Sequence, residues 1–276
     1  MINLFVDEVT AAIKSLKNGK AAGLDEIRPE MLKALGSSGT IWLTRVIRVA
    51  WDSGKTPLDW QTGVVIPIFK KGDQRDCTNY RGISLLSLPG KVYAKVLERK
   101  CRAIVDSKIQ DEQCGFRTGR STTDQIFTLK QIFEKAWEYN VKVYSCFVDL
   151  EKAYDRVPRG QLWGVLQEYG IDGQLLGAIK SLYEDCRCHV RINGVKSNPF
   201  TVGKGLRQGC VLSPLLFIIY MDWIARRSQG VECVRLGEQE FRHLLCSQTT
   251  LFSSLHHRPN SRMRWRGSQP YVRRPE

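Results

Sequence analysis

Val143-Tyr-Ser-Cys-Phe-Val-Asp-Leu150 runs without interruption into Glu151-Lys-Ala-Tyr-Asp-Arg-Val-Pro158, so that a strand-like run leads directly into a charged one. The first part is rich in β-branched and aromatic residues, which predicts a buried strand. The strand presents one carboxylate, Asp149, at its carboxyl end. That group must be solvated, paired or bound to a metal, because burying it alone costs too much free energy. Taken alone, the segment indicates only a solvated aspartate.

The composition is that of a folded, strongly basic chain. Its 276 residues suffice for one large or two small domains with a proper core, and 42% of them are hydrophobic. Lys and Arg number 42 against 28 Asp and Glu, which gives a net charge of +14. This balance favours a polyanionic partner, although a soluble protein with basic faces has the same composition.

Cysteine usage and hydropathy bear on the compartment. The nine Cys are scattered singly and no pair of Cys-x-x-Cys clusters indicates zinc, so Cys186-Arg-Cys188-His189 is interpreted as structural. Reduced thiols are typical of an intracellular protein. No secretion signal opens the sequence and no apolar run approaches ~18 residues. We therefore expect no membrane association and an intracellular location, nuclear or cytoplasmic.

Helical periodicity dominates the first part of the chain. Residues 6–17 have an apolar residue every three or four positions, and Asn18-Gly19 predicts the end of that helix. A second helix is predicted over 28–35, where Pro29 suits the first turn. A third is predicted over 39–53, and its apolar residues are Trp42, Val46, Val49 and Ala50.

A basic turn then separates two apolar strands. Thr62-Gly-Val-Val-Ile-Pro-Ile-Phe-Lys-Lys-Gly-Asp73 predicts one strand, Asn79-Tyr-Arg-Gly-Ile-Ser-Leu-Leu86 predicts the other, and a helix follows over about 89–105. Lys supplies a compact charge and Arg a bidentate fork, so Lys70, Lys71 and Arg81 suit a triphosphate. An ordinary solvated basic hairpin has the same pattern.

The segment Gln113-Cys-Gly-Phe-Arg-Thr-Gly-Arg-Ser121 combines glycines, which allow close backbone approach, with arginines that suit phosphates. Ser121, followed by Asp124, predicts a helix cap. The helix is predicted to reach about residue 139 and to bury four apolar residues, Ile126, Leu129, Phe133 and Trp137.

Short elements are predicted in the rest of the chain. Helices are predicted over 159–169 and 174–183, and the Asn-Gly pair in His189-Val-Arg-Ile-Asn-Gly-Val195 is typical of a hairpin. Ser213-Pro214 predicts the start of a helix that is buried, because its body is apolar all round. Another hairpin is predicted from residues 231–236 and 240–245.

Several segments carry a family resemblance. Asp149-Leu-Glu-Lys-Ala-Tyr154 resembles the first catalytic motif of reverse transcriptases, and Gly205-Leu-Arg-Gln-Gly-Cys-Val-Leu-Ser-Pro214 resembles the second. Gly19-Lys-Ala-Ala-Gly-Leu-Asp25 is similar to an entry motif of non-LTR (LINE-type) retrotransposon polymerases. The resemblance covers about residues 6–245.

The resemblance implies an α+β fold: the fingers and a partial palm of a right-hand polymerase, with an antiparallel palm sheet packed on helices and no thumb. It divides the chain into an N-terminal helical extension (1–55), fingers (56–140), a partial palm (141–245) and an aberrant basic tail (246–276). The tail has many arginines and no apolar periodicity, so we expect it to be disordered.

The resemblance also assigns roles to individual residues. Asp149 is the catalytic residue and a metal ligand, and the Leu150 carbonyl is a second ligand. The nucleotide-binding residues are Lys70, Arg81, Leu150, Tyr154, Gln208 and Gly209, and Tyr154 excludes a 2′-hydroxyl. The template-binding residues are Gln113, Arg117 and Arg120. The implied cofactors are two Mg²⁺ ions, or Mn²⁺, and the implied partners are an RNA template, a DNA primer and deoxynucleoside triphosphates.

The sequence departs from the family where its remaining metal-binding carboxylates belong. An aromatic-Ala-Asp-Asp turn is expected after Leu244-Leu245, but Cys246-Ser-Gln-Thr-Thr-Leu-Phe-Ser253 stands there and no acid occurs between Glu240 and Glu276. One possible set of codons for Gln-Thr-Thr-Leu-Phe-Ser would encode Asp-Asp-Val-Val-Leu if it were read in the frame that begins two bases later. We therefore hypothesise a slip of the reading frame near Cys246, which the transcript sequence would test.

Two functions are consistent with these observations. The first is an RNA-directed DNA polymerase of a LINE-type retroelement, which joins a primer 3′-hydroxyl to an α-phosphate by two-metal nucleotidyl transfer. The alternative is a catalytically dead nucleic-acid-binding remnant, because the second carboxylate pair is absent.

Overall fold

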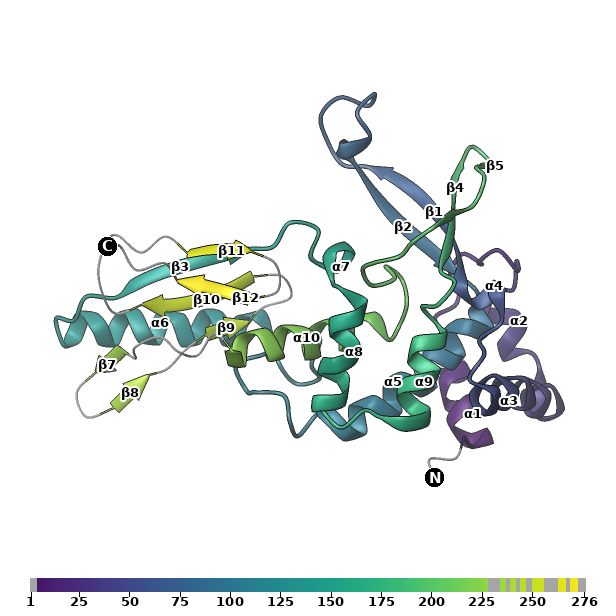
Figure 1. Ribbon diagram of the computed structural model, residues 1–276, viewed down its shortest axis with the longest axis horizontal. Coiled ribbons are helices and arrows are strands. Elements are labelled where there is room, and N and C mark those ends of the chain that lie inside the picture. The colour runs from purple at the N-terminus through teal and green to yellow at the C-terminus, as the bar shows by residue number, and fades with distance from the viewer. Residues whose placement is uncertain are drawn as a thin grey trace. The chain divides into compact units, whose positions relative to one another are not determined.

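The computed structural model describes residues 4–227 and six short strands beyond them, at 234–236, 239–241, 244–246, 250–255, 263–266 and 269–272. The chain forms two compact units (Figure 1). The first consists of residues 1–108 and 154–219, and the second of residues 109–153 and 220–276. Helices and strands occur in both, which confirms the α+β class.

Helices make up most of the first unit. They are α1 (Val6–Lys14), α2 (Pro29–Lys33), α3 (Gly36–Ser53), α4 (Leu58–Gln61), α5 (Leu88–Val105), α8 (Arg159–Glu168) and α9 (Gly173–Ser181). Val9, Ile47, Leu97 and Ile179 have no measurable exposure, so α1, α3, α5 and α9 share one core. The first helix ends at Lys14, earlier than predicted, because the chain turns at Ser15 before Asn18-Gly19 is reached.

The sheet of the first unit has the order β2-β1-β4-β5, with β6 also paired to β4. Its strands are β1 (Thr62–Phe69), β2 (Tyr80–Leu86), β4 (Arg187–Ile192), β5 (Val195–Lys196) and β6 (Phe200–Thr201), and the 3₁₀ turn η1 (Cys77–Asn79) precedes β2. The pair β1–β4 is parallel, and the other pairs are antiparallel.

Both predicted hairpins in this sheet are confirmed. The β1–β2 and β4–β5 hairpins extend in the same direction from the helices of their unit (Figure 1). Asn193 and Gly194 have φ angles of +50° and +84°, as a two-residue turn with left-handed residues at both centres requires. The Asn-Gly signal therefore identified the turn type as well as its place.

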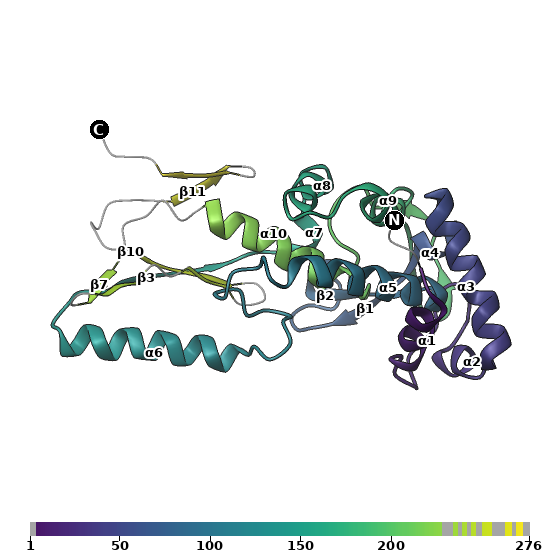
Figure 2. The same cartoon turned by 90° about the horizontal axis from the view of Figure 1, so that it is seen from below.

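The second unit contains α6 (Thr122–Glu138) and a three-stranded antiparallel sheet in the order β3-β10-β9. These strands are β3 (Tyr144–Asp149), β9 (Leu244–Cys246) and β10 (Thr250–Leu255), and Figure 2 shows α6 along one side of them. Two further hairpins are β7 (Val234–Leu236) with β8 (Gln239–Phe241), and β11 (Met263–Arg266) with β12 (Gln269–Val272). The predicted hairpin within 231–245 thus exists, although its residues 231–233, 237–238 and 242–243 lie outside the described ones.

Two helices cross the boundaries between the units: α7 (Ala153–Arg156) and α10 (Ser213–Arg227). The predicted burial of α10 is confirmed, since the side chains from Leu215 to Asp222 are all less than one tenth exposed. Among the described residues, no helix combines the length and apolar character needed to cross a bilayer.

The predicted burial of α6 is wrong. Ile126, Phe133 and Trp137 are 62%, 42% and 89% exposed, and the buried positions are Ile132 and Ala136. Ala136 packs against Val141 and Val143, where the chain turns towards β3. Helical periodicity allows two overlapping apolar stripes on this sequence, and the one with the small alanine lies inwards because it permits close packing.

The structure describes strands within residues 246–276, and the predicted disorder of this tail stays a prediction. Residues 250–255 form β10 and pair with the whole of β3, from Thr250 opposite Asp149 to Leu255 opposite Tyr144. The run Thr250-Leu-Phe-Ser-Ser-Leu255 mixes β-branched, aromatic and aliphatic residues, so it can complete a sheet despite the basic composition around it.

Truncating the core of the first unit provides a test of this fold. Leu97→Ala removes a fully buried side chain from α5, and we expect it to lower the free energy of unfolding by about 2–5 kcal/mol. Leu58→Ala, at a half-exposed position of α4, should change it by less than about 0.5 kcal/mol. Urea unfolding followed by circular dichroism measures both, and equal losses would contradict the described core.

Candidate functional site

The loop from Gly203 to Cys210 lies directly against two other segments of the first unit. The N–H of Gly205 donates to the Val157 carbonyl at 3.0 Å, and the N–H of Leu206 donates to the Tyr154 carbonyl at 2.7 Å. A Cβ at Gly205, where φ is +80°, would lie 2.6 Å from the Asp155 carbonyl oxygen. Only glycine fits here, so the loop is fixed backbone to backbone against α7 and the turn that follows it.

The far end of the same loop touches the sheet. A Cβ at Gly209, where φ is +91°, would lie 2.5 Å from the carbonyl oxygen of Ser84 in β2. The loop is thus held between residues 154–157 on one side and β2 on the other. This contact joins segments that resemble the two catalytic motifs to the strand that carries Arg81.

Two arginines fix the loop, Arg159 from outside it and Arg207 from within it. Arg159 donates to the carbonyls of Gly205 at 2.9 Å and of Tyr183 at 3.0 Å, and its guanidinium lies 5.0 Å from the centroid of the Tyr183 ring. Arg207 donates to the carbonyls of Trp60 at 2.7 Å and of Leu182 at 3.3 Å. Each planar fork thus connects segments that are distant in the sequence, which a flexible lysine could not do.

Gln208 faces a small cavity of about 220 Å³ beside the loop. Its Nε2 donates to Asp155 Oδ1 at 2.9 Å, so the amide is oriented by a carboxylate from α7. Ser84 and Arg207 also line this cavity, and so do the thiols of Cys186 and Cys188. Burial raises the pKa of both thiols, which makes them neutral lining groups.

Tyr154 is half buried between its own short helix and α10. Its ring stacks on Phe217 with centroids 4.5 Å apart and an angle of 17° between the planes. Burial raises the pKa of Tyr154, so the phenol is neutral at physiological pH. The ring is held by this stacking, and the Tyr154 carbonyl by the Leu206 N–H.

The two predicted phosphate-binding cations lie on the β1–β2 hairpin. The N–H of Lys70 donates to the Asn79 carbonyl at 2.8 Å, which closes the hairpin just beyond β1. Arg81 is exposed and lies opposite Ile68 in the ladder. Neither forms an ion pair with another described residue, so both charges remain available to an anion.

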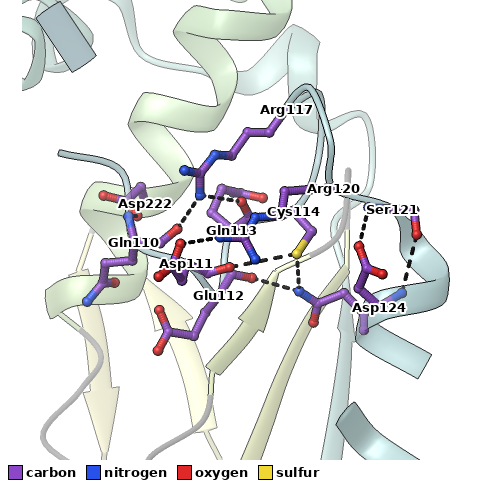
Figure 3. A network of polar contacts seen from close by, with 11 residues as sticks. Gln110, Asp111, Glu112, Gln113, Cys114, Arg117, Arg120, Ser121, Asp124 and Asp222 are labelled. Atoms are coloured by element: carbon purple, nitrogen blue, oxygen red, sulfur yellow. Dashed lines mark hydrogen bonds and ion pairs between the residues drawn. The ribbon is translucent and has the colours of Figure 1, made fainter. Parts of the chain in front are cut away.

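The three predicted template residues lie together in the second unit (Figure 3). Gln113 is buried, and its Oε1 accepts from the N–H of Gly115 at 3.1 Å. Arg117 Nη1 donates to the carbonyls of Gln110 at 2.7 Å and Gln113 at 3.1 Å. These two side chains therefore shape the turn, because their polar atoms are engaged with its backbone.

Arg120 is the member of this group that reaches solvent. It pairs with Asp111, and both side chains are substantially exposed. An exposed pair of this kind contributes at most about 1 kcal/mol, so a phosphate could replace the carboxylate at little cost. The predicted cap of α6 is confirmed beside it: Asp124 N donates to Ser121 Oγ, and Ser121 N donates to Asp124 Oδ2 at 2.7 Å.

Asp222 anchors this turn to α10. Its Oδ1 accepts from the N–H of Gln110 at 2.9 Å (Figure 3). Its Oδ2 accepts from Arg226 Nε at 2.8 Å. The carboxylate is fully buried, and these contacts satisfy both oxygens. Asp222 therefore has a structural role, holding the turn against α10.

Asp149 ends β3 in the second unit, with Thr250 of β10 as its ladder partner. Leu150 follows it outside the strand. Within the described part of the chain, no group of three or more His, Cys, Asp or Glu residues is arranged to hold a metal ion. The ladder thus places a threonine, Thr250, opposite Asp149, the one carboxylate among the predicted metal ligands.

The predicted residues fall into four sets. Tyr154, Gln208 and Gly209 are brought together by the loop in the first unit, and Lys70 and Arg81 share a hairpin of that unit. The template residues share a turn in the second unit. Asp149 lies in the same unit at the end of β3, where it pairs with β10. Sequence reasoning missed Asp155, Arg159 and Arg207, because nothing local marks an arginine whose partners are distant backbone carbonyls.

Comparison with known proteins gives one family. Residues 68–236 match the model of a family described as reverse transcriptase (RNA-dependent DNA polymerase). The chain is 30% identical over 217 residues to the uncharacterized 149 kDa protein of transposon TX1 from Xenopus laevis, a match that covers 79% of this chain and 17% of that protein. It is also 30% identical over 218 residues to a probable RNA-directed DNA polymerase from transposon BS of Drosophila melanogaster, covering 78% of this chain and 24% of that protein.

Other relatives and a solved structure agree. The RNA-directed DNA polymerase from the mobile element jockey of Drosophila melanogaster is 28% identical over 220 residues, which cover 78% of this chain and 24% of that protein. The chain thus spans about a quarter or less of the length of these curated relatives. Apo telomerase from Candida tropicalis, truncated from its C-terminal domain, matches with a TM-score of 0.50 at 17% identity, covering 86% of this chain and 52% of that one. This last similarity concerns the fold alone.

The contact between the loop and β2 can be tested with two glycines of the same loop. Gly209→Ala places a Cβ against the Ser84 carbonyl at a strained φ, and we expect it to cost about 2 kcal/mol or more. Gly203→Ala has no atom within 4 Å of the new Cβ and should be nearly neutral. Hydrogen exchange should accelerate at amides 204–210 only in the first variant, and equal exchange in both would contradict the contact.

Proposed function

The chain belongs to the reverse transcriptase (RNA-dependent DNA polymerase) family of LINE-type transposons, and we propose on that basis that it forms the fingers and partial palm of an enzyme that copies RNA into DNA. In this proposal residues 1–55 are a helical extension, 56–140 fingers, 141–245 a partial palm and 246–276 an aberrant basic tail. The partners would be an RNA template, a DNA primer and deoxynucleoside triphosphates, within an intracellular ribonucleoprotein, nuclear or cytoplasmic.

One observation carries the proposal. The segment that resembles the second catalytic motif is hydrogen-bonded through Gly205 and Leu206 to the segment that follows the first, at Val157 and Tyr154. The end of the first motif and the start of the second, about fifty residues apart in the sequence, therefore lie together in the first unit. A chance resemblance of two short segments would not require them to meet through backbone hydrogen bonds.

The first unit supports a nucleotide-binding role. Gln208 and Gly209 would form the floor of the nucleotide site, with Gln208 oriented by Asp155. The Tyr154 ring, fixed on Phe217, would exclude a 2′-hydroxyl. Lys70 and Arg81 lie on a hairpin of the same unit, form no ion pair with another described residue, and would hold the triphosphate. In the second unit, the Leu150 carbonyl follows β3 and stays a predicted nucleotide and metal ligand.

The turn from residue 109 to 121 would bind the template. Arg120 would exchange Asp111 for a phosphate, whereas Gln113 and Arg117 would maintain the shape of the turn from within. Phosphate contacts of this kind position a strand without reading its sequence, as a polymerase that copies any template requires.

The donor set falls short of the two divalent cations that the family's chemistry uses. Asp149 and the Leu150 carbonyl offer ligands at one place, but the ladder puts Thr250 opposite Asp149 and no acid occurs between Glu240 and Glu276. Magnesium prefers carboxylate and phosphate oxygens, and a single aspartate cannot hold a pair of ions. The residues present in this chain therefore do not support a two-metal step.

This shortfall supports a second candidate for this chain, a nucleic-acid-binding remnant of the polymerase that lacks catalysis. It would keep the basic surface, and bind RNA in a salt-sensitive way, without extending a primer. The slip of the reading frame near Cys246 stays a hypothesis, and sequencing the transcript across codons 240–260 tests it.

Restoring the carboxylates separates the two candidates. We expect the chain as written to give little primer extension in Mg²⁺, and Thr249→Asp/Thr250→Asp to increase it, because Thr250 is the ladder partner of Asp149. Adding Asp149→Asn to that variant should remove the gain. The rate of primer extension should fall by about 10³-fold or more if the aspartate acts in the chemical step. Extension of a labelled DNA primer on an RNA template measures all three.

The contradicting outcomes are distinct. A gain that survives Asp149→Asn would show that Asp149 is not part of the site. Failure of every variant to extend a primer, together with intact RNA binding, would support the remnant. Failure to bind RNA at all would contradict both candidates.

The role of Tyr154 can be tested in the carboxylate-restored variant. Tyr154→Ala should reduce the preference for dGTP over GTP by roughly 10- to 100-fold in the ratio of kcat/KM values, because a steric barrier to one hydroxyl is removed. Tyr154→Phe keeps the ring and should retain the preference. If Tyr154→Ala lowers kcat/KM equally for both nucleotides, the ring is only a packing element against Phe217.

A further inference from the structure

Helix α3 has two apolar stripes, although covering the core of its own unit requires one. The inward stripe is buried in that core and consists of Thr44, Ile47, Ala50 and Trp51. The outward stripe consists of Trp42, Val46 and Val49, whose side chains are 64%, 48% and 67% exposed. We call these three residues the outer seam. Exposed apolar residues that adjoin one another mark an interaction surface more often than isolated ones do.

The outer seam has the spacing of a coiled coil. Trp42 and Val49 are seven residues apart with Val46 between them, and Leu35 lies seven residues before Trp42. This spacing keeps the side chains on one narrow line along the helix, which faces a single partner helix. Figure 2 shows α3 at the margin of the first unit. The seam therefore fits a second helix laid along α3.

Two opposite charges lie on one flank of the outer seam. Arg45 and Asp52 are both exposed, and neither forms an ion pair with another described residue. The guanidinium of Arg45 lies 4.9 Å from the centroid of the Trp42 ring, so it is held beside the seam. Arg45 and Asp52 cannot pair within one chain, because seven residues of helix separate them by about 10 Å. A partner helix that presents an acid to Arg45 and a base to Asp52 would neutralise both.

A second copy of α3 in the opposite direction has this arrangement. A two-fold axis across the helix near residue 48 reverses the second helix and brings the same flanks together. Arg45 of each copy then faces Asp52 of the other, and Val46 of each faces Val49 of the other. A parallel pair would instead place equal charges at the same height, and neither would be neutralised. The charges of α3 thus complement a reversed copy of the same helix.

We propose that two copies of this chain associate through antiparallel α3 helices, with the outer seams in contact and Arg45 paired with Asp52 of the other copy. A contact of one helix pair is smaller than the roughly 1,200 Å² of a stable complex, so the dimer is weak and depends on concentration. Neither Trp42, Val46 nor Val49 lines the cavity beside Gln208, so each copy keeps that cavity. The inference concerns assembly and does not depend on the proposed function.

Polar substitution of the seam tests the contact. Sedimentation equilibrium of the full chain from about 5 to about 200 μM should show a monomer–dimer equilibrium. Val46→Ser/Val49→Ser should raise the dissociation constant by about tenfold or more, because the apolar centre of the contact is lost. Serine has nearly the helix propensity of valine, so α3 itself is preserved. The control Ile41→Ser/Leu58→Ser changes two exposed apolar residues outside the seam and should dimerise like wild type.

Exchanging the two charges tests the direction of the helices. Arg45→Asp places two acids together across the axis and Asp52→Arg places two bases together, so each should weaken the dimer by roughly fivefold. The double variant Arg45→Asp/Asp52→Arg restores opposite charges and should return the dissociation constant to within about twofold of wild type. Far-ultraviolet circular dichroism and Tm in dilute solution should match wild type for every variant, because all the changed side chains are exposed.

The opposing outcomes overturn the inference in different ways. A wild-type chain that stays monomeric over the whole concentration range has no such contact. A dimer that the seam variant forms equally well uses another surface, and a dimer that the control loses as well reflects unspecific apolar association. A double charge variant as weak as the single ones excludes the antiparallel pair. RNA binding and primer extension, measured separately, decide the proposed function whichever of these results is found.

Discussion

The backbone contact of the glycine loop with residues 154–157 is the constraint on which the candidate site depends. Gly205 has neither room for a Cβ nor an ordinary φ, and its N–H is already bonded to Val157. Since peptide groups rather than side chains meet there, the distance between the two segments is fixed to within a hydrogen bond. That contact therefore determines the positions of Tyr154 and Gln208.

Arg159 and Arg207 explain how such a loop stays in place without regular secondary structure. Both guanidiniums bond to carbonyls of the loop or of segments around it, namely Gly205, Tyr183, Trp60 and Leu182. These carbonyls lie at the ends of helices and turns, where backbone acceptors would otherwise be left without donors. The arginines thus satisfy the termini of α4 and α9 and orient the loop at the same time. The cavity beside Gln208 is lined by the same parts, so its shape depends on them.

The sequence predicted features that are encoded locally. The Asn193-Gly194 turn, the Ser121–Asp124 cap and the buried body of α10 each follow from a few neighbouring residues. Long-range features escaped it: the parallel pairing of β1 with β4, the carbonyl partners of Arg159, and the choice of Ala136 over Trp137 as the inward side of α6. Strand partners and helix facing are decided by tertiary packing, which one-dimensional periodicity leaves open.

The parallel pairing of β1 with β4 has a consequence for synthesis on the ribosome. One edge of β1 is covered at once by β2, which follows it after a short turn, but the other must wait for Arg187 to emerge. At about 5–20 residues per second, that edge stays bare for on the order of 6–24 s. An unpaired strand edge can pair with another chain, so the edge of β1 at Thr62–Val65 is open to such association until β4 emerges.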